Sequence, residues 1–231
     1  MVVLFTCKLW RFTIDKDLEY LTMKMAGMKP YTVEIEPDTV MRFWVPSETT
    51  LSNRTQNLKP AVVLLHGFAG DGLVTWAFQI ITLAKNYSVY VLDLIFFGGS
   101  TTDRSNRSPS FLAVGLKKLG MEKCVLVGFS YDGTVAFKMA ELYSKLVRSV
   151  VVTGSVLAIQ ESLISRSLEN VGFSSCLEML LPSSVEGLKA LLSVVVYKNI
   201  WFPNFLLNDF LKVCIFLVSL KFIKLLNKCI L

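Results

Sequence analysis

The chain has 231 residues, of which 53% are hydrophobic, and a formal net charge of +6 at pH 7. This length suits one globular domain with a large core and a small insertion. Four lysines lie between residues 212 and 231, where there is no acidic residue, so most of the excess charge belongs to that segment. The charge therefore does not predict a nucleic-acid-binding protein.

Neither end of the chain has the pattern of a signal peptide or of a membrane-spanning helix. The N-terminal apolar run is short and gives way to Lys8 and Arg11. The apolar run 213–220 stops at Lys221, well below the roughly 20 residues that a span requires. We expect a cytoplasmic protein. The single histidine and the absence of a CxxC pair predict no metal and no other cofactor.

In chain order, the first predicted element is a hairpin at 31–46, where apolar and polar residues alternate around Pro37 and Asp38. Apolar runs that suit buried strands follow, with helical spacing between them, and they occupy residues 61–68, 87–94, 123–128 and 146–155. Strands that alternate with helices predict an α/β fold with a mostly parallel sheet and helices on both faces. After Val156 the spacing is mainly helical.

The stretch Gly128-Phe129-Ser130-Tyr131-Asp132-Gly133 joins a predicted strand to a predicted helix. It is typical of a nucleophile elbow, the tight turn that presents a catalytic serine, and small residues around the serine let strand and helix approach each other. Ser130 is the predicted nucleophile. The N–H of Tyr131, at the positive end of the helix, is a predicted oxyanion donor. Asp132 stands where a small residue is usual.

A second motif, "HGF", follows the first buried strand of the predicted sheet. In this type of fold the loop after that strand supplies the other oxyanion donor, which here is the N–H of Phe68. The segments "HGFAGDG", "DLIFFGGSTT", "GFSYDG" and "AFKMAELY" resemble, in this order, those of the α/β-hydrolase superfamily. Within it they resemble plant proteins described as α/β-hydrolase-fold or monoacylglycerol-lipase-like esterases. The resemblance covers residues 30–212.

This resemblance implies a serine ester hydrolase core with a helical cap, and an ester or lipid-like small molecule as ligand. It divides the chain into an N-terminal segment (1–30), a partial α/β-hydrolase core (31–155), a helical cap (156–212) and an atypical apolar, basic tail (213–231). It also implies structural roles for the motif positions around the site, namely His66, Gly67, Asp93, Gly98, Gly99, Gly128, Asp132 and Gly133.

The family's catalytic acid and histidine follow the cap on two further strands. Here residues 213–231 contain neither an acid nor a histidine. His66 as a substitute base, and Asp93 as the acid, are less favoured than structural roles in their loops. We therefore expect a C-terminally truncated and catalytically incomplete hydrolase. The alternative is a non-catalytic ligand-binding or regulatory protein, with peripheral membrane contact through residues 213–231.

Overall fold

The computed structural model describes residues 16–48, 59–67, 71–95, 97–103, 109–155, 168–170, 172–180, 182–195, 201–209 and 211–212. The chain divides into two compact units. One spans Trp10–Leu157, and the other consists of Met1–Leu9 and Ala158–Leu231. The first unit holds the sheet and the turn that contains Ser130.

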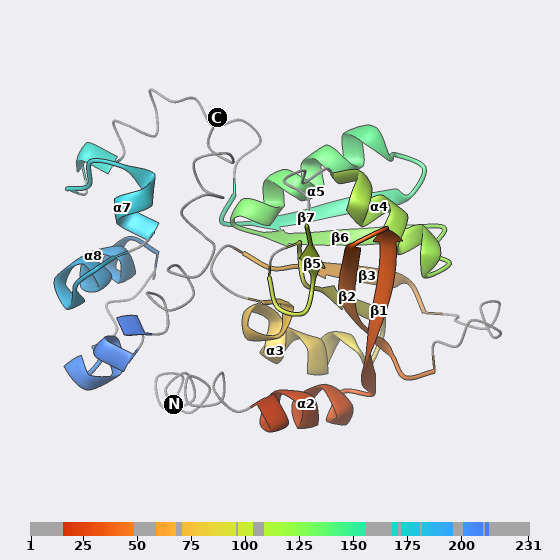
Figure 1. Cartoon of the computed structure of the whole chain (residues 1–231), viewed down its shortest axis with the longest axis horizontal. Helices are drawn as coiled ribbons and strands as arrows, with labels where there is room; N and C mark the ends of the chain where they lie inside the picture. The colour runs from red at the N-terminus through yellow and green to blue at the C-terminus, as the bar shows by residue number, and fades with distance from the viewer. Residues whose placement is uncertain are drawn as a thin grey trace. The chain divides into compact units, whose positions relative to one another are not determined.

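The described strands form one mixed sheet in the order β1-β2-β4-β3-β6-β7, with β5 paired to β2 (Figure 1). Their bounds are β1 (Met28–Glu36), β2 (Thr39–Pro46), β3 (Ala61–Leu65), β4 (Ser88–Leu92), β5 (Thr101–Thr102), β6 (Cys124–Phe129) and β7 (Val147–Thr153). β1 and β2 are the predicted hairpin, and its turn places Asp38 at a φ of 64°. The four strands β4, β3, β6 and β7 pair in parallel. The α/β fold class predicted from the sequence is confirmed.

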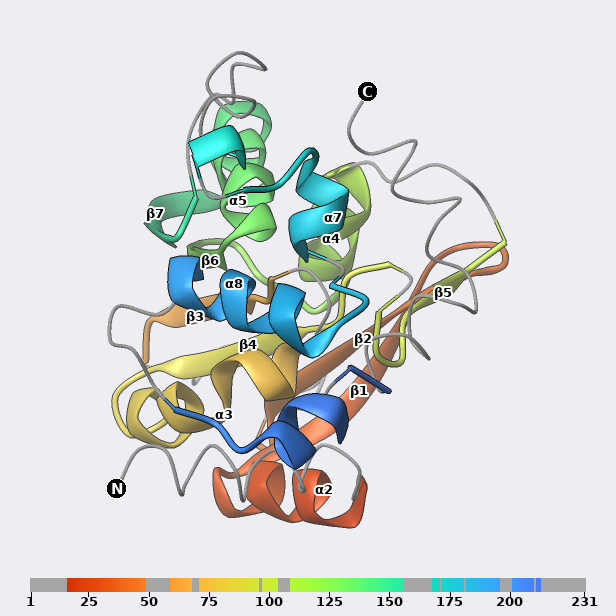
Figure 2. The same cartoon turned by 90° about the vertical axis from the view of Figure 1, so that its left-hand side faces the viewer.

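Helices cover both faces of this sheet, as Figure 2 shows. α2 (Lys16–Met25) and α3 (Gly72–Leu83) lie on one face. α4 (Pro109–Lys118) and α5 (Tyr131–Leu142) lie on the other. The sequence did not predict α2, because this helix depends on the burial of Met23 in the cluster on the α3 face of the sheet.

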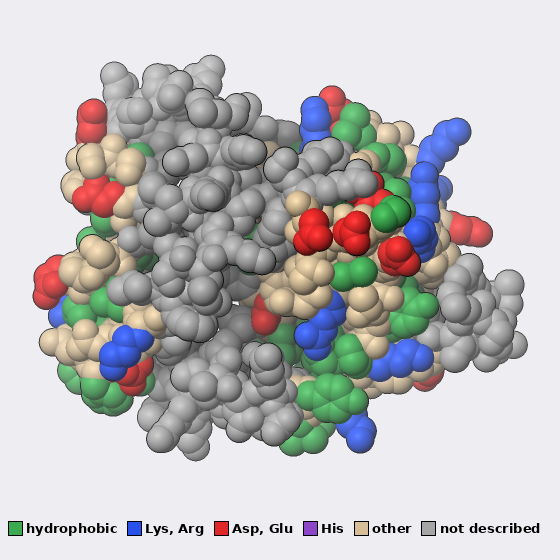
Figure 3. Space-filling view, viewed as in Figure 1, with side chains coloured by type: hydrophobic (Ala, Val, Ile, Leu, Met, Phe, Trp, Pro, Cys, Tyr) green, Lys and Arg blue, Asp and Glu red, His purple; other side chains and the backbone are tan. Residues whose placement is uncertain are grey.

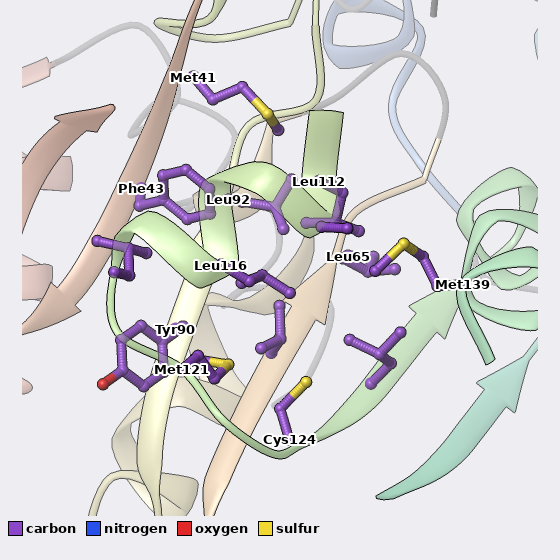
Figure 4. Packing of buried hydrophobic residues seen from close by; sticks show 14 of the residues in the cluster. Met41, Phe43, Leu65, Tyr90, Leu92, Leu112, Leu116, Met121, Cys124 and Met139 are labelled. Atoms are coloured by element: carbon purple, nitrogen blue, oxygen red, sulfur yellow. The ribbon is translucent and has the colours of Figure 1, made fainter. Parts of the chain in front are cut away.

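The core under α4 and α5 is the larger of the two clusters in the first unit (Figure 4). In it Phe43 and Leu65 from the sheet meet Leu116 of α4 and Met139 of α5, all of them almost fully buried. The opposite cluster is built on Trp76 of α3. Each Å² of apolar surface that is removed from water stabilises the fold by about 25 cal/mol. These two clusters are therefore the main source of stability of the first unit.

β7 corrects one expectation from the sequence, in which the apolar run 146–155 suits a buried strand. Val147 is buried and Val150 packs against the core, but the side chain of Val151 is 52% exposed. Within the described residues β7 pairs only with β6 and therefore forms an edge of the sheet. An apolar run of β-branched residues predicts a strand, but it does not predict which elements cover each face of that strand.

The second unit is helical where it is described. It contains α7 (Cys176–Leu180) and α8 (Val185–Val195), and the Ser184 hydroxyl caps α8 by accepting the Gly187 N–H at 3.0 Å. Leu188 packs with Leu207 and Leu211 in a separate small cluster.

The described helices include none that is long and apolar enough to cross a bilayer. On the face of the molecule shown in Figure 3, acidic, basic and hydrophobic side chains of the described residues are intermixed.

Candidate active site

The turn between β6 and α5 holds Ser130 in a backbone conformation that few non-glycine residues adopt, with φ 55° and ψ −124°. Such a conformation costs on the order of 1–3 kcal/mol and persists only where its surroundings enforce it. Here the Ser130 N–H donates to the Thr153 carbonyl at 2.9 Å, and the Ser130 carbonyl accepts the Gly133 N–H at 3.0 Å. Hydrogen bonds to β7 and within α5 thus hold the turn on both sides.

Two glycines allow strand and helix to meet at this turn. A Cβ at Gly128 would lie 2.7 Å from the Asp132 carbonyl oxygen and 2.8 Å from the Gly133 Cα. A Cβ at Gly133 would overlap the Ser155 side chain and would lie 2.6 Å from the Val152 Cγ1. The structure therefore gives a steric reason for the small residues in this motif.

The N–H of Tyr131 is the first of α5, so no earlier turn of the helix supplies it with an acceptor. It lies at the positive end of the helix dipole, directly after Ser130. Gly67, after the end of β3, lies beside the serine, because a Cβ there would be 3.4 Å from the Ser130 Cβ. Phe68, the other predicted oxyanion donor, lies outside the described residues.

His66 is fully buried, and both of its ring nitrogens are engaged with the backbone. Nδ1 lies 2.8 Å from the Gly67 carbonyl, and Nε2 accepts the Leu94 N–H at 3.1 Å. These partners assign the proton to Nδ1. Burial lowers the pKa of His66, although its contact with the Gly67 carbonyl opposes this. The ring therefore stays neutral, and neither nitrogen is free to take a proton from Ser130.

Asp93 connects two loops through its buried carboxylate. Oδ1 accepts the Gly72 N–H at 3.2 Å, and Oδ2 accepts the Gly99 N–H at 2.9 Å. Burial raises the pKa of Asp93, while the hydrogen bond from Gly99 lowers it. Gly98, at φ 51°, packs so closely against this carboxylate that a Cβ would overlap it. The geometry ties α3 to the loop before β5.

Asp132 is only 1% exposed, and neither carboxylate oxygen has a hydrogen-bond partner among the residues that the structure describes. It shares the buried stripe of α5 with Ala136 and Met139, which belong to the core cluster. Burial raises the pKa of Asp132 well above its ordinary value. A carboxyl group thus lies in an apolar core two residues after the serine.

Sequence reasoning missed Phe129, which immediately precedes the serine. Its ring makes an edge contact with Trp76 at 6.5 Å between centroids, and its side chain remains 42% exposed. The Trp76 indole N–H donates to the Leu65 carbonyl at 3.1 Å. A bulky aromatic residue at this variable motif position was the available signal.

Comparison with known proteins gives consistent results. A family model for the alpha/beta hydrolase fold matches residues 60–190, which is more than half of the chain. Human epoxide hydrolase 4 is 32% identical over 100 residues, covering 41% of this chain and 27% of that protein. Human 1-acylglycerol-3-phosphate O-acyltransferase ABHD5 is 29% identical over 140 residues, covering 56% of this chain and 39% of that protein. The chain therefore spans well under half the length of these relatives.

Solved structures agree on the fold. The 2-hydroxy-6-oxo-6-phenylhexa-2,4-dienoate hydrolase of Rhodococcus sp. strain RHA1 is 20% identical, with a TM-score of 0.62 over 86% of this chain and 69% of that one. A membrane phospholipase A is 19% identical, with a TM-score of 0.66 over 94% of this chain and 68% of that one. With its sheet order, its strained serine turn and the family match over residues 60–190, this chain belongs to the alpha/beta hydrolase fold family.

Proposed function

We propose that this chain carries a site of the serine ester hydrolase type, with Ser130 Oγ as the nucleophile. The observation that carries the proposal is the positive φ of Ser130 between a parallel strand and the N-terminus of α5. This geometry presents the hydroxyl at the carboxyl end of the strands, and the N–H groups of Tyr131 and Phe68 would stabilise the oxyanion of an acyl intermediate.

We further propose that these 231 residues alone turn over esters poorly. Their only histidine is His66, whose ring nitrogens both contact backbone groups. A serine without a base keeps only the part of catalysis that comes from oxyanion stabilisation and binding, about 10³–10⁴ over water. Asp132 adds a second obstacle, because a carboxylate near a developing oxyanion opposes it whenever the group is ionised.

The test uses a fluorophosphonate probe and a p-nitrophenyl ester with the full chain, its Ser130→Ala variant and its Ser149→Ala variant. Ser149 is an exposed serine on β7 and serves as the control. We expect slow labelling that Ser130→Ala removes and Ser149→Ala keeps, with ester turnover no more than about 10³–10⁴-fold above the uncatalysed rate. Labelling that persists in Ser130→Ala would reject Ser130 as the nucleophile. Fast turnover that depends on Ser130 would reject the claim of incompleteness.

A second candidate function is non-catalytic binding of an ester or lipid-like small molecule. The engagement of both His66 ring nitrogens with backbone groups favours it, because His66 is the only histidine in these 231 residues and is not free to activate Ser130. In this case Ser130→Ala keeps ligand-induced stabilisation, which a thermal shift assay measures.

Peripheral membrane contact through residues 213–231 is a separate proposal, since those residues lie outside the described ones. It rests on their apolar and basic composition. Deleting residues 213–231 should reduce sedimentation with anionic vesicles, and unchanged sedimentation would dismiss the contact. The narrower resemblance to plant esterases likewise stays a prediction.

A further inference from the structure

The side chain of Phe129 occupies an unusual place for a large aromatic residue. It belongs to β6, whose earlier residues are buried or half-buried, and yet it is 42% exposed at the carboxyl end of that strand. An exposed aromatic ring leaves much of its 150–250 Å² of apolar surface in water. This ring directly adjoins the serine that the proposed function makes reactive.

The ring reaches across the end of β6 from one neighbouring strand to the other. On one side, a Cβ at Gly67 would lie 2.8 Å from the Phe129 Cδ1. On the opposite side, a Cβ at Gly154 would lie 3.4 Å from the Phe129 Cε2. The two glycines, which follow β3 and β7, thus border the two edges of the ring. Trp76 of α3 makes an edge contact with it.

These contacts place the ring and the serine on one surface. Gly67 approaches both, since its Cβ position lies 3.4 Å from the Ser130 Cβ and 2.8 Å from the ring. A Cβ at Gly154 would lie 4.0 Å from the Ser130 amide nitrogen. A molecule that reaches the Ser130 hydroxyl from this side therefore meets the exposed part of an aromatic ring held between two residues without side chains.

We infer that Phe129 is a ligand-contacting residue of the Ser130 site and forms an apolar wall for the hydrocarbon part of an acyl ligand. The inference rests on the proposed function at Ser130 and adds the chemical class of the bound group. An exposed ring bordered by glycine backbone gains contact area from an alkyl chain, because burying apolar surface is the favourable term. A small polar acyl group gains nothing comparable there.

Two probes separate this inference from the proposed function. Octylboronic acid bonds to a serine oxygen through boron without a leaving group, and the hydroxyl proton passes to the buffer. Octanamide binds without a covalent bond. Their butyl counterparts, butylboronic acid and butanamide, measure the contribution of the chain, since each added methylene that is fully buried raises affinity about fourfold. Isothermal titration calorimetry with the full chain gives all four dissociation constants.

The variants are Phe129→Ala, Phe129→Leu and, as a control, Leu142→Ala. Leu142 is an exposed apolar residue at the far end of α5. We expect the octyl probes to bind more tightly than the butyl probes, and Phe129→Ala to weaken octyl binding about tenfold. Phe129→Leu should weaken it about threefold, with Leu142→Ala unchanged. Circular dichroism melting identifies any variant that fails to fold, and Phe129→Leu keeps the test valid if Phe129→Ala does.

The outcomes are distinct. If Phe129 variants bind the octyl probes as tightly as the wild type, or if the wild type binds none of the four probes, the inference is overturned. A Ser130→Ala variant completes the set. If octanamide binding depends on Phe129 while octylboronic acid binds Ser130→Ala as tightly as the wild type, the inference stands and the proposed nucleophile fails. A chain-length effect that Leu142→Ala removes equally would assign the octyl group to another surface and reject the inference.

Discussion

Replacing Asp132 with alanine should stabilise the fold, which is the reverse of the usual effect of a core substitution. In the wild type the carboxyl group is buried on the core-facing stripe of α5 with no hydrogen-bond partner among the described residues. An unsatisfied buried polar group costs about 1–3 kcal/mol, and an ionised one costs more. Alanine removes that cost and is the best helix former. We expect Asp132→Ala to raise the free energy of unfolding by about 1–3 kcal/mol at pH 7.

The gain should depend on pH in a direction fixed by burial. Burial raises the pKa of Asp132 in the folded chain above the unfolded value of about 4. Below the unfolded pKa the carboxyl group is neutral in both states, so the wild type loses no stability through its ionisation. As the pH rises from the unfolded pKa towards the folded pKa, the unfolded chain ionises first and the free energy of unfolding of the wild type falls. The advantage of Asp132→Ala should therefore be smallest near pH 4 and should widen as the pH increases.

Urea unfolding followed by circular dichroism between pH 4.5 and 8 measures this difference. For a unit of this size, 1 kcal/mol corresponds to a melting-temperature shift of about 3 °C. Thr134→Ala, an exposed position in the same first part of α5, is the control and should show no widening with pH. The reasoning fails if Asp132→Ala is less stable than the wild type, or if its advantage is constant or shrinks as the pH rises.

Three further predictions concern the surroundings of the serine. Gly128→Ala should lower stability by about 1–3 kcal/mol, because the added methyl meets the Asp132 carbonyl at 2.7 Å; an unchanged melting temperature would contradict this. Asp93→Asn should cost about 1–3 kcal/mol in urea unfolding, since an amide can accept only one of the two backbone N–H groups that the carboxylate accepts. Burial raises the pKa of the Cys124 thiol to about 12, so mass spectrometry should find Cys124 unalkylated by iodoacetamide at pH 8 until urea unfolds the chain.

Much of the architecture could be predicted from patterns that are local in the chain. Alternation around Asp38 identified the β1–β2 hairpin, and the run before Ser130 identified β6. The helix α2 was missed because its fold depends on a distant contact, the burial of Met23 against the sheet cluster. The exposure of Val151 was missed for the same reason, since a run of valines does not say which element lies over it.

In the candidate site, too, features that depend on neighbouring residues could be predicted and features that depend on distant contacts could not. Glycine spacing around Ser130 follows from local sterics, so the sequence could predict the turn. The hydrogen bonding of the His66 ring could not be predicted, because Nε2 accepts the N–H of Leu94, which lies 28 residues further along the chain. The burial of Asp132 likewise depends on the register of α5 against the sheet. Residue type alone left open whether its charge faces the serine or the core.

The strained serine turn and the side chains around it are stabilised by different interactions, and this explains how the turn persists beside an unfavourable Asp132. Ser130 is held by backbone hydrogen bonds to Thr153 and Gly133 and by the close approach of glycines, none of which depends on a titratable group. Its conformation should therefore tolerate changes at Asp132 and His66. The same bonds make the turn depend on β7, which is an edge strand in the described structure. Loss of β7 pairing would release the Ser130 N–H and, with it, the geometry on which any nucleophilic role rests.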